Sequence, residues 1–136
     1  MLKLRIIPIL SFNGFALVKT KQFSTARMVG NPIQAARVYN ARGVDELVLI
    51  DIMASEQNRT LPIEIVKEVL KVCYMPVAVG GGVRSIEQIS ELLKIGADKI
   101  VIKSAAIINP KFIEEAVNIF GSQCICIAVD CCLFEG

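Results

Sequence analysis

The chain has 136 residues, 54% of them hydrophobic and 21% charged, with a formal net charge of +2. This length is enough for one domain, and the apolar content predicts a folded core rather than a disordered chain. The small net charge predicts neither nucleic acid nor an anionic membrane as a partner. Its apolar runs are shorter than the about 18 residues that a membrane span needs. The N-terminal stretch "MLKLRIIPIL" lacks the cleavage site of a secretory signal, so we expect a cytoplasmic protein.

Five short apolar runs predict buried β-strands along the chain. Most of them are nearly continuous in Val, Ile, Leu and Ala, which is typical of parallel strands that are covered on both faces. Ser11 follows directly at the end of the first run, and a Gly-containing loop that carries Lys19 comes next. These two residues either take part in a reaction or have no functional role. In chain order the predicted strands are residues 5–10, 46–52, 76–81, 99–104 and 124–130.

Four helical patterns alternate with these strands. The first, "NPIQAARVYNARG", begins with an Asn–Pro pair, and the second, about 61–72, has Pro62 in its first turn. The third has Ser85 and Gln88 at the spacing of a capping box. The fourth, "NPKFIEEAVNIFG", repeats the Asn–Pro start at Asn109.

Repeated alternation of strand and helix predicts a parallel sheet with right-handed crossovers. Residues 43–52 and 96–105 share a Gly-x-Asp-charged-apolar pattern, and this internal repeat favours a (β/α)8 TIM barrel over an open sheet. A complete barrel needs about 250 residues. We therefore predict that 1–136 is a single partial barrel domain, with about the first five strands and four helices. Its open strand edges would be available for self-association.

In such barrels the reaction takes place at the C-terminal ends of the strands. Read in order, those ends carry Ser11, Asp51, the glycines 80–82, the pair Lys103 and Ser104, and Asp130. Each residue taken alone could merely cap a loop or a helix, whereas the set together favours a functional site.

The segment "VGGGVRS" predicts a phosphate site. Glycines such as Gly82 allow backbone N–H groups to approach an anion, and the helix that begins near Ser85 adds its positive dipole end. Ser104, which follows Lys103, offers a hydroxyl and an amide to the same anion. The alternative is that the glycines serve only tight packing between strand and helix.

Two carboxylates are candidates for substrate binding and for acid–base catalysis. Asp51 and Asp130 both follow apolar strands, where desolvation would raise the pKa of a carboxyl group. They could equally accept hydrogen bonds from loop N–H groups.

Charges also gather at the opposite ends of the strands. Arg5, Glu46 and Lys99 open three strands, and Asp45 and Asp98 directly precede two of them. On a barrel these residues would meet at the bottom face, either as ordinary solubilising charge or as an ion-pair cluster that plugs the lower mouth.

The chain has five cysteines and no histidine. Their odd number and irregular spacing argue against a disulfide scaffold, and a zinc site is not expected. We predict buried free thiols, no metal and no cofactor. The cysteines are Cys73, Cys124, Cys126, Cys131 and Cys132.

The segments "RIIPIL", "VDELVLIDI", "VGGGV", "ELLKIGADKI", "FGSQ" and "IAVD" together resemble the HisF family, the cyclase subunits of imidazole glycerol phosphate synthase. The similarity covers essentially the whole chain. It implies a (β/α)8 barrel, with a HisH-like glutamine amidotransferase docked on the bottom face. Ammonia released there would cross the barrel and enter a phosphorylated ribonucleotide at the top. That substrate would be cleaved and cyclised to imidazole glycerol phosphate and an aminoimidazole carboxamide ribonucleotide.

The resemblance also implies roles for residues at the top. Asp130 matches one of the two catalytic aspartates of the family, while Ser11 stands where the other is expected. Lys19 and Asp51 match substrate contacts. A phosphate site would use Gly82 with Lys103 and Ser104, positions where the family more usually has Asn and Thr after the fourth strand.

At the bottom, the resemblance implies an ammonia gate made of Arg5, Glu46 and Lys99. Asp98 and Gln123 match positions that face the amidotransferase. The residues at the ammonia entrance thus match those of the family, whereas Ser11 and the pair Lys103 and Ser104 at the catalytic end differ from it.

Four functional hypotheses follow. The chain is part of the histidine-pathway cyclase, or of a HisF-like paralogue that supplies ammonia for amidation of an amino sugar in surface-polysaccharide synthesis. Ser11, the loop "VKT" and "NRT" at 58–60 favour the paralogue. It could instead be a catalytically inactive half-barrel, or belong to a different phosphate-binding barrel enzyme, which the match at the bottom face disfavours.

Overall fold

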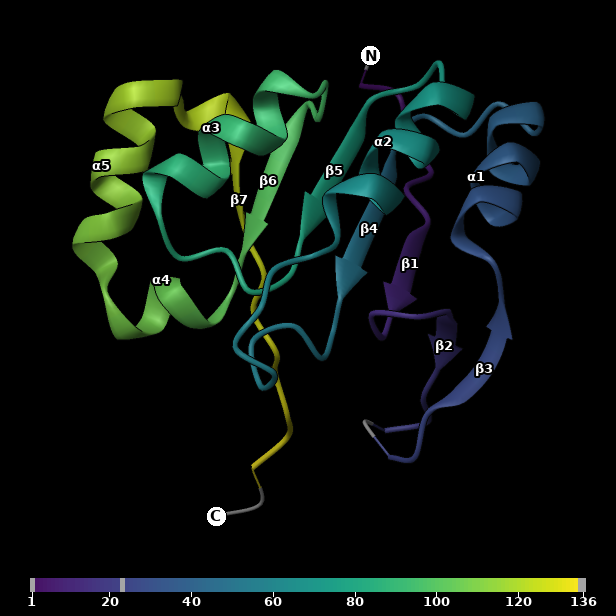
Figure 1. The fold of residues 1–136 in the computed structure, drawn as a ribbon, viewed down its shortest axis with the longest axis horizontal. Helices are drawn as coiled ribbons and strands as arrows, with labels where there is room; N and C mark the ends of the chain where they lie inside the picture. Colours follow the sequence, from purple (N-terminus) through teal and green to yellow (C-terminus); the bar gives the residue numbers. More distant parts are fainter. Residues whose placement is uncertain (1, 23, 135–136) are drawn as a thin grey trace.

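One seven-stranded sheet, in the order β3-β2-β1-β4-β5-β6-β7, organises the molecule (Figure 1). This computed structural model describes residues 2–22 and 24–134. The predicted parallel strands are present as neighbours in the sheet, and their C-terminal ends point to the lower edge of Figure 1. They are β1 (Ile9–Phe12), β4 (Leu47–Asp51), β5 (Val77–Gly80), β6 (Lys99–Ile102) and β7 (Ile125–Ile127).

The first strand lies later in the chain than predicted. The apolar run 5–10 contributes only its last two residues to β1, which continues to Phe12. Before β1 the chain contacts the β4 side through isolated bonds: Ile6 and Pro8 accept from the backbone N–H groups of Asp45 and Val48. Pro8 has no N–H to donate to a ladder. Ser11 therefore lies within β1 rather than after it.

A hairpin replaces the loop that was predicted after the first strand. It consists of β2 (Leu17–Lys19) and β3 (Arg27–Gly30), which pair antiparallel, and β2 also pairs antiparallel with β1. The pairing of β2 with β1 is limited to one position, Phe12 with Leu17, so this edge of the parallel sheet is only partly covered. At the other side, β6 is the one strand that pairs with β7 in the described part of the chain.

The four predicted helices are confirmed as α1 (Pro32–Ala41), α2 (Ile63–Val72), α3 (Ile86–Lys94) and α5 (Pro110–Phe120). The capping box of Ser85 and Gln88 is formed. Pro62 is the N-cap of α2 and not part of its first turn. The short helix α4 (Ser104–Ile108) and the 3-10 turn η1 (Ser122–Cys124) were not predicted, so the described chain has five α-helices rather than four.

The helices cover one face of the sheet, and the core lies between the two layers. Leu10 and Phe12 of β1 and Leu49 of β4 are buried there. On the other face Ile9 is 63% exposed, and this face would line the interior of a closed barrel. One layer of helices on a parallel-dominant sheet is the architecture of about half of a TIM barrel, as predicted. In the described residues, no helix has the length and apolar character to cross a membrane.

Candidate functional site

Ser11 and Asp51 lie on neighbouring strands but on opposite faces of the sheet. Ser11 is in register with Ile50, on the open face, while Asp51 is in register with Phe12, whose side chain is buried on the helix side. Successive residues of a strand point to opposite faces. The structure therefore brings the two predicted residues to the same edge of the sheet without placing their side chains in one pocket.

Asp51 is a buried charged residue, 3% exposed, and its partner is Arg59 from the loop after β4. The guanidinium donates to both carboxylate oxygens, with Nη2 at 3.2 Å from Oδ1. The backbone N–H of Met53 also donates to Oδ1, at 3.0 Å. Asp51 is thus fixed as the acceptor of a bidentate ion pair. Sequence reasoning missed Arg59, because a loop arginine carries no local signal of its partner.

The glycines after β5 fit closely around this ion pair. A Cβ on Gly81 would lie 2.7 Å from Cβ of Asp51, and one on Gly82 would lie 1.9 Å from the carbonyl oxygen of Arg59. Both glycines have positive φ, +133° and +67°. Tight packing, the alternative weighed for the glycine run, is therefore a structural requirement at these positions.

The N-terminus of α3 is already capped by its own side chains. Ser85 Oγ accepts from the N–H of Gln88 at 3.3 Å, and Gln88 Oε1 accepts from the N–H groups of Arg84 and Ser85 at 2.9 and 3.2 Å. These three donors do not point to a free anion site. The capping box therefore occupies these three N–H groups, and the contribution of this helix end to phosphate binding stays a prediction.

Lys103 forms an ion pair with Asp130. Lys103 precedes α4, and Asp130 lies three residues beyond the end of β7, so the pair joins the ends of two neighbouring strands. Both side chains are about half exposed. Ser104 is the first residue of α4 and is partly buried. The predicted phosphate-binding lysine and catalytic carboxylate are therefore in direct contact.

Lys19 is exposed at the end of β2. It is in register with Arg27 of β3, so two cations lie side by side on the hairpin that begins beside β1. The structure places Lys19 on an ordered strand rather than in the loop that was predicted.

The predicted ion-pair cluster is present at the N-terminal ends of the strands. Glu46 accepts from Arg5 Nη1 at 3.1 Å through Oε1 and from Lys99 Nζ at 2.9 Å through Oε2. The Glu46 side chain is 12% exposed, whereas Arg5 is 65% exposed. The largely buried carboxylate of Glu46 therefore bridges Lys99, the first residue of β6, and Arg5, which precedes β1.

The neighbouring aspartates hold backbone groups at this end. Asp45 accepts from the N–H of Ile6 at 2.8 Å, and Asp98 accepts from the N–H of Val77 at 2.8 Å. The Ile6 hydrogen bond, together with Lys3 and Arg5, holds the pKa of Asp45 below its usual value. Gln123 is exposed in η1.

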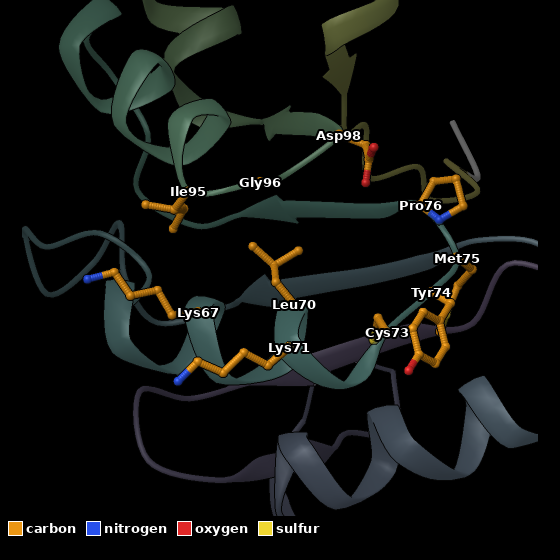
Figure 2. A pocket seen from close by; sticks show the side chains of 10 residues that line it. All are labelled: Lys67, Leu70, Lys71, Cys73, Tyr74, Met75, Pro76, Ile95, Gly96 and Asp98. Carbon is orange, nitrogen blue, oxygen red and sulfur yellow. The ribbon is translucent and has the colours of Figure 1, made fainter.

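A groove of about 530 Å³ opens beside Asp98, between the C-terminal half of α2 and the turn after α3 (Figure 2). It lies at the end of the sheet away from Asp51 and Arg59. Its lining residues are Lys67, Leu70, Lys71, Cys73, Tyr74, Met75, Pro76, Ile95, Gly96 and Asp98.

The prediction of buried thiols was wrong. Cys131 and Cys132 are exposed, and the other three cysteines are partly buried. Partial burial raises the pKa of the Cys73 thiol. Among the described residues, no group of three or more His, Cys, Asp or Glu side chains is arranged to hold a metal ion.

Comparisons with known proteins cover most of the chain. A family model described as "Histidine biosynthesis protein" matches residues 5–133. The imidazole glycerol phosphate synthase subunit HisF of Helicobacter hepaticus (strain ATCC 51449 / 3B1) is 51% identical over 126 residues. That alignment covers 93% of this chain and 50% of the relative. The chain thus spans about half the length of this curated relative.

Proposed function

This chain belongs to the histidine biosynthesis protein family as a HisF-family protein, and from that premise we propose that it forms part of the cyclase subunit of imidazole glycerol phosphate synthase. The observation that carries the proposal is the separation of two charged sites along the same strands. Glu46 with Arg5 and Lys99 lies at the N-terminal ends, and Asp51 with Arg59 lies at the C-terminal ends.

The N-terminal end is proposed to receive ammonia. A HisH-like glutamine amidotransferase would dock on the face that carries Asp98 and Gln123, both of which are exposed. Ammonia would then pass the Arg5–Glu46–Lys99 cluster and travel along the open face of the sheet. Val48 and Ile50 line that face, and apolar walls suit the neutral form of ammonia better than ammonium.

The C-terminal end is proposed to hold a phosphorylated ribonucleotide. Lys19, Lys103 and Ser104 would supply two cations and a hydroxyl to bind phosphate, together with the backbone of Gly82. Asp51 would accept hydrogen bonds from the substrate, and Asp130 would transfer protons during cyclisation. Ser11 lacks a carboxylate, and losing a proton-transfer group costs roughly 10²–10⁴-fold in rate.

A second candidate is the HisF-like paralogue that supplies ammonia for amidation of an amino sugar. The identity of Ser11 favours it over the cyclase, because this hydroxyl on the open face stands where the family resemblance implies a catalytic carboxylate. An inactive half-barrel is the outcome if neither substrate class reacts.

Complementation of a bacterium that lacks its own cyclase tests the choice directly. The full-length product of the gene is expressed with Ser11 and with Ser11→Asp. Growth without histidine, at least for Ser11→Asp, supports the cyclase. If both forms are stably produced and neither allows growth, the cyclase proposal fails.

A further inference from the structure

Arg59 satisfies all five of its N–H donors with acceptors from its own loop, from the β1–β2 turn and from the end of β4. Beyond its two bonds to Asp51, Nε donates to Gln57 Oε1 at 2.7 Å. Nη1 also donates to the carbonyl of Thr60 at 3.4 Å, and Nη2 to the carbonyl of Asn13 at 3.3 Å. A guanidinium carries five N–H groups in a rigid fork. Such complete use of the fork by protein acceptors indicates a fixed side chain rather than a solvated surface charge.

The partners of Arg59 come from separate parts of the chain. Asp51 ends β4, and Asn13 begins the turn that leads from β1 into the hairpin carrying Lys19. In that turn Asn13 Oδ1 accepts from the N–H groups of Phe15 and Ala16 at 3.0 and 2.8 Å. Arg59 therefore ties the hairpin to the carboxylate of the neighbouring strand.

The turn is shaped to receive the guanidinium. Gly14 has a φ of +92°, and a Cβ there would lie 2.3 Å from Nη2 of Arg59. Any side chain at position 14 would displace the arginine. The missing side chain of Gly14 and the carbonyl of Asn13 thus both accommodate Nη2 of Arg59.

We propose that Arg59 is a positioning residue of the substrate site: it fixes the plane of the Asp51 carboxylate and locks the β1–β2 turn, and through it the strand that carries Lys19. The functional part of this inference rests on the proposed function. Arg59 itself is not required to touch substrate. A lysine cannot replace it, because an ammonium group is a point charge that cannot bind both carboxylate oxygens and reach Asn13 together.

Hydrogen exchange on the full-length protein tests the lock without any substrate. The variants are Arg59→Lys, which keeps the charge, and Arg42→Lys as a matched control at an exposed position at the end of α1. In Arg59→Lys the amides of Asn13, Phe15 and Ala16 should exchange about tenfold faster or more, while those of β5 stay unchanged. Arg42→Lys should match the unmodified protein. Unchanged exchange in the turn overturns the proposal, as does an equal rise throughout the molecule, which would indicate general destabilisation.

Kinetics with ammonium as nitrogen donor tests the link to substrate. For Arg59→Lys we expect KM to rise roughly tenfold or more with kcat kept within about twofold, because Asp51 and Lys19 are proposed to bind the substrate and the loss of such binding raises KM. An unchanged KM overturns the positioning role. If the unmodified protein shows no turnover, the proposed function fails, and the exchange experiment still decides the lock.

Discussion

At the residue scale, the site depends on a partner that the local sequence does not indicate. Asp51 was predicted as a functional residue because it directly follows an apolar strand. Arg59, eight positions later in a polar loop, has a role only once the fold brings Asn13 and Asp51 beside it. The glycine run shows the same limit, because its closeness to Arg59 and Asp51 is a tertiary property.

Two glycines with nearly the same positive φ allow the cost of backbone strain to be measured apart from the cost of a steric clash. Gly43 and Gly82 have φ of +66° and +67°, but a Cβ on Gly43 meets nothing within 4 Å. Gly43→Ala should cost about 1 kcal/mol of unfolding free energy from the left-handed conformation. Gly82→Ala should cost at least about 2 kcal/mol more, because the methyl group would collide with the carbonyl of Arg59. Denaturant titration of both variants measures the difference, and equal losses would contradict the packing described here.

Asp45 should stabilise the folded protein near neutral pH and lose this contribution as the pH becomes acidic. Its pKa is held below the usual value in the folded state, chiefly by the Ile6 N–H bond. A depressed folded pKa stabilises the protein above the unfolded pKa, and this stabilisation is lost as the pH falls from about 4 through the folded value. Asp45→Asn should therefore be less stable than the unmodified protein at pH 6, with the difference shrinking toward pH 3. A difference that does not change with pH would contradict this assignment.

At the element scale, identical sequence signals have different outcomes. Asn31 and Asn109 both precede a proline that starts a helix, and both were predicted as helix starts. Asn31 Oδ1 accepts from the N–H groups of Ile33 and Gln34, whereas the side chain of Asn109 makes no capping bond to α5. Asn109 is also the C-cap of α4, so one residue ends that helix and begins α5. The sequence predicted the helix boundaries well, but not which cap forms.

These two asparagines form a matched pair for mutation. Asn31→Ala should lower the unfolding free energy by about 1 kcal/mol, the usual cost of losing a side-chain N-cap. Asn109→Ala should cost less than about 0.5 kcal/mol, since no capping bond is lost. Thermal unfolding of the two variants checks the difference. A larger loss at Asn109 than at Asn31 would contradict the capping geometry.

The hairpin of β2 and β3 shows why some elements escape prediction. Its strands have three and four residues, and all four residues of β3 are exposed. Neither strand has a length or an alternation that separates it from a loop. Pairing of β2 with β3 and with the end of β1, rather than local preference, defines this element.

At the scale of the whole molecule, the alternation of strands and helices predicted the parallel sheet, and the internal repeat together with the family resemblance predicted the partial barrel. The open face and β7 carry exposed apolar side chains, including Ile9 at 63% and Ile127 at 46%. We propose that the 136-residue chain, produced alone, self-associates through these surfaces, because a sheet with one uncovered apolar face is a pairing surface. Sedimentation over a range of concentrations should show dimers or larger species, which Ile9→Lys should weaken. A monomer at every concentration would contradict this proposal.

Ammonia-dependent turnover by the purified full-length gene product, assayed with the phosphorylated ribonucleotide of the cyclase reaction, tests the central claim most directly. Formation of imidazole glycerol phosphate together with the aminoimidazole carboxamide ribonucleotide is the expected result, with a rate increased by Ser11→Asp. Glutamine should replace ammonium only when a HisH-like subunit is added. A folded protein that forms neither product, before or after Ser11→Asp, would contradict the account.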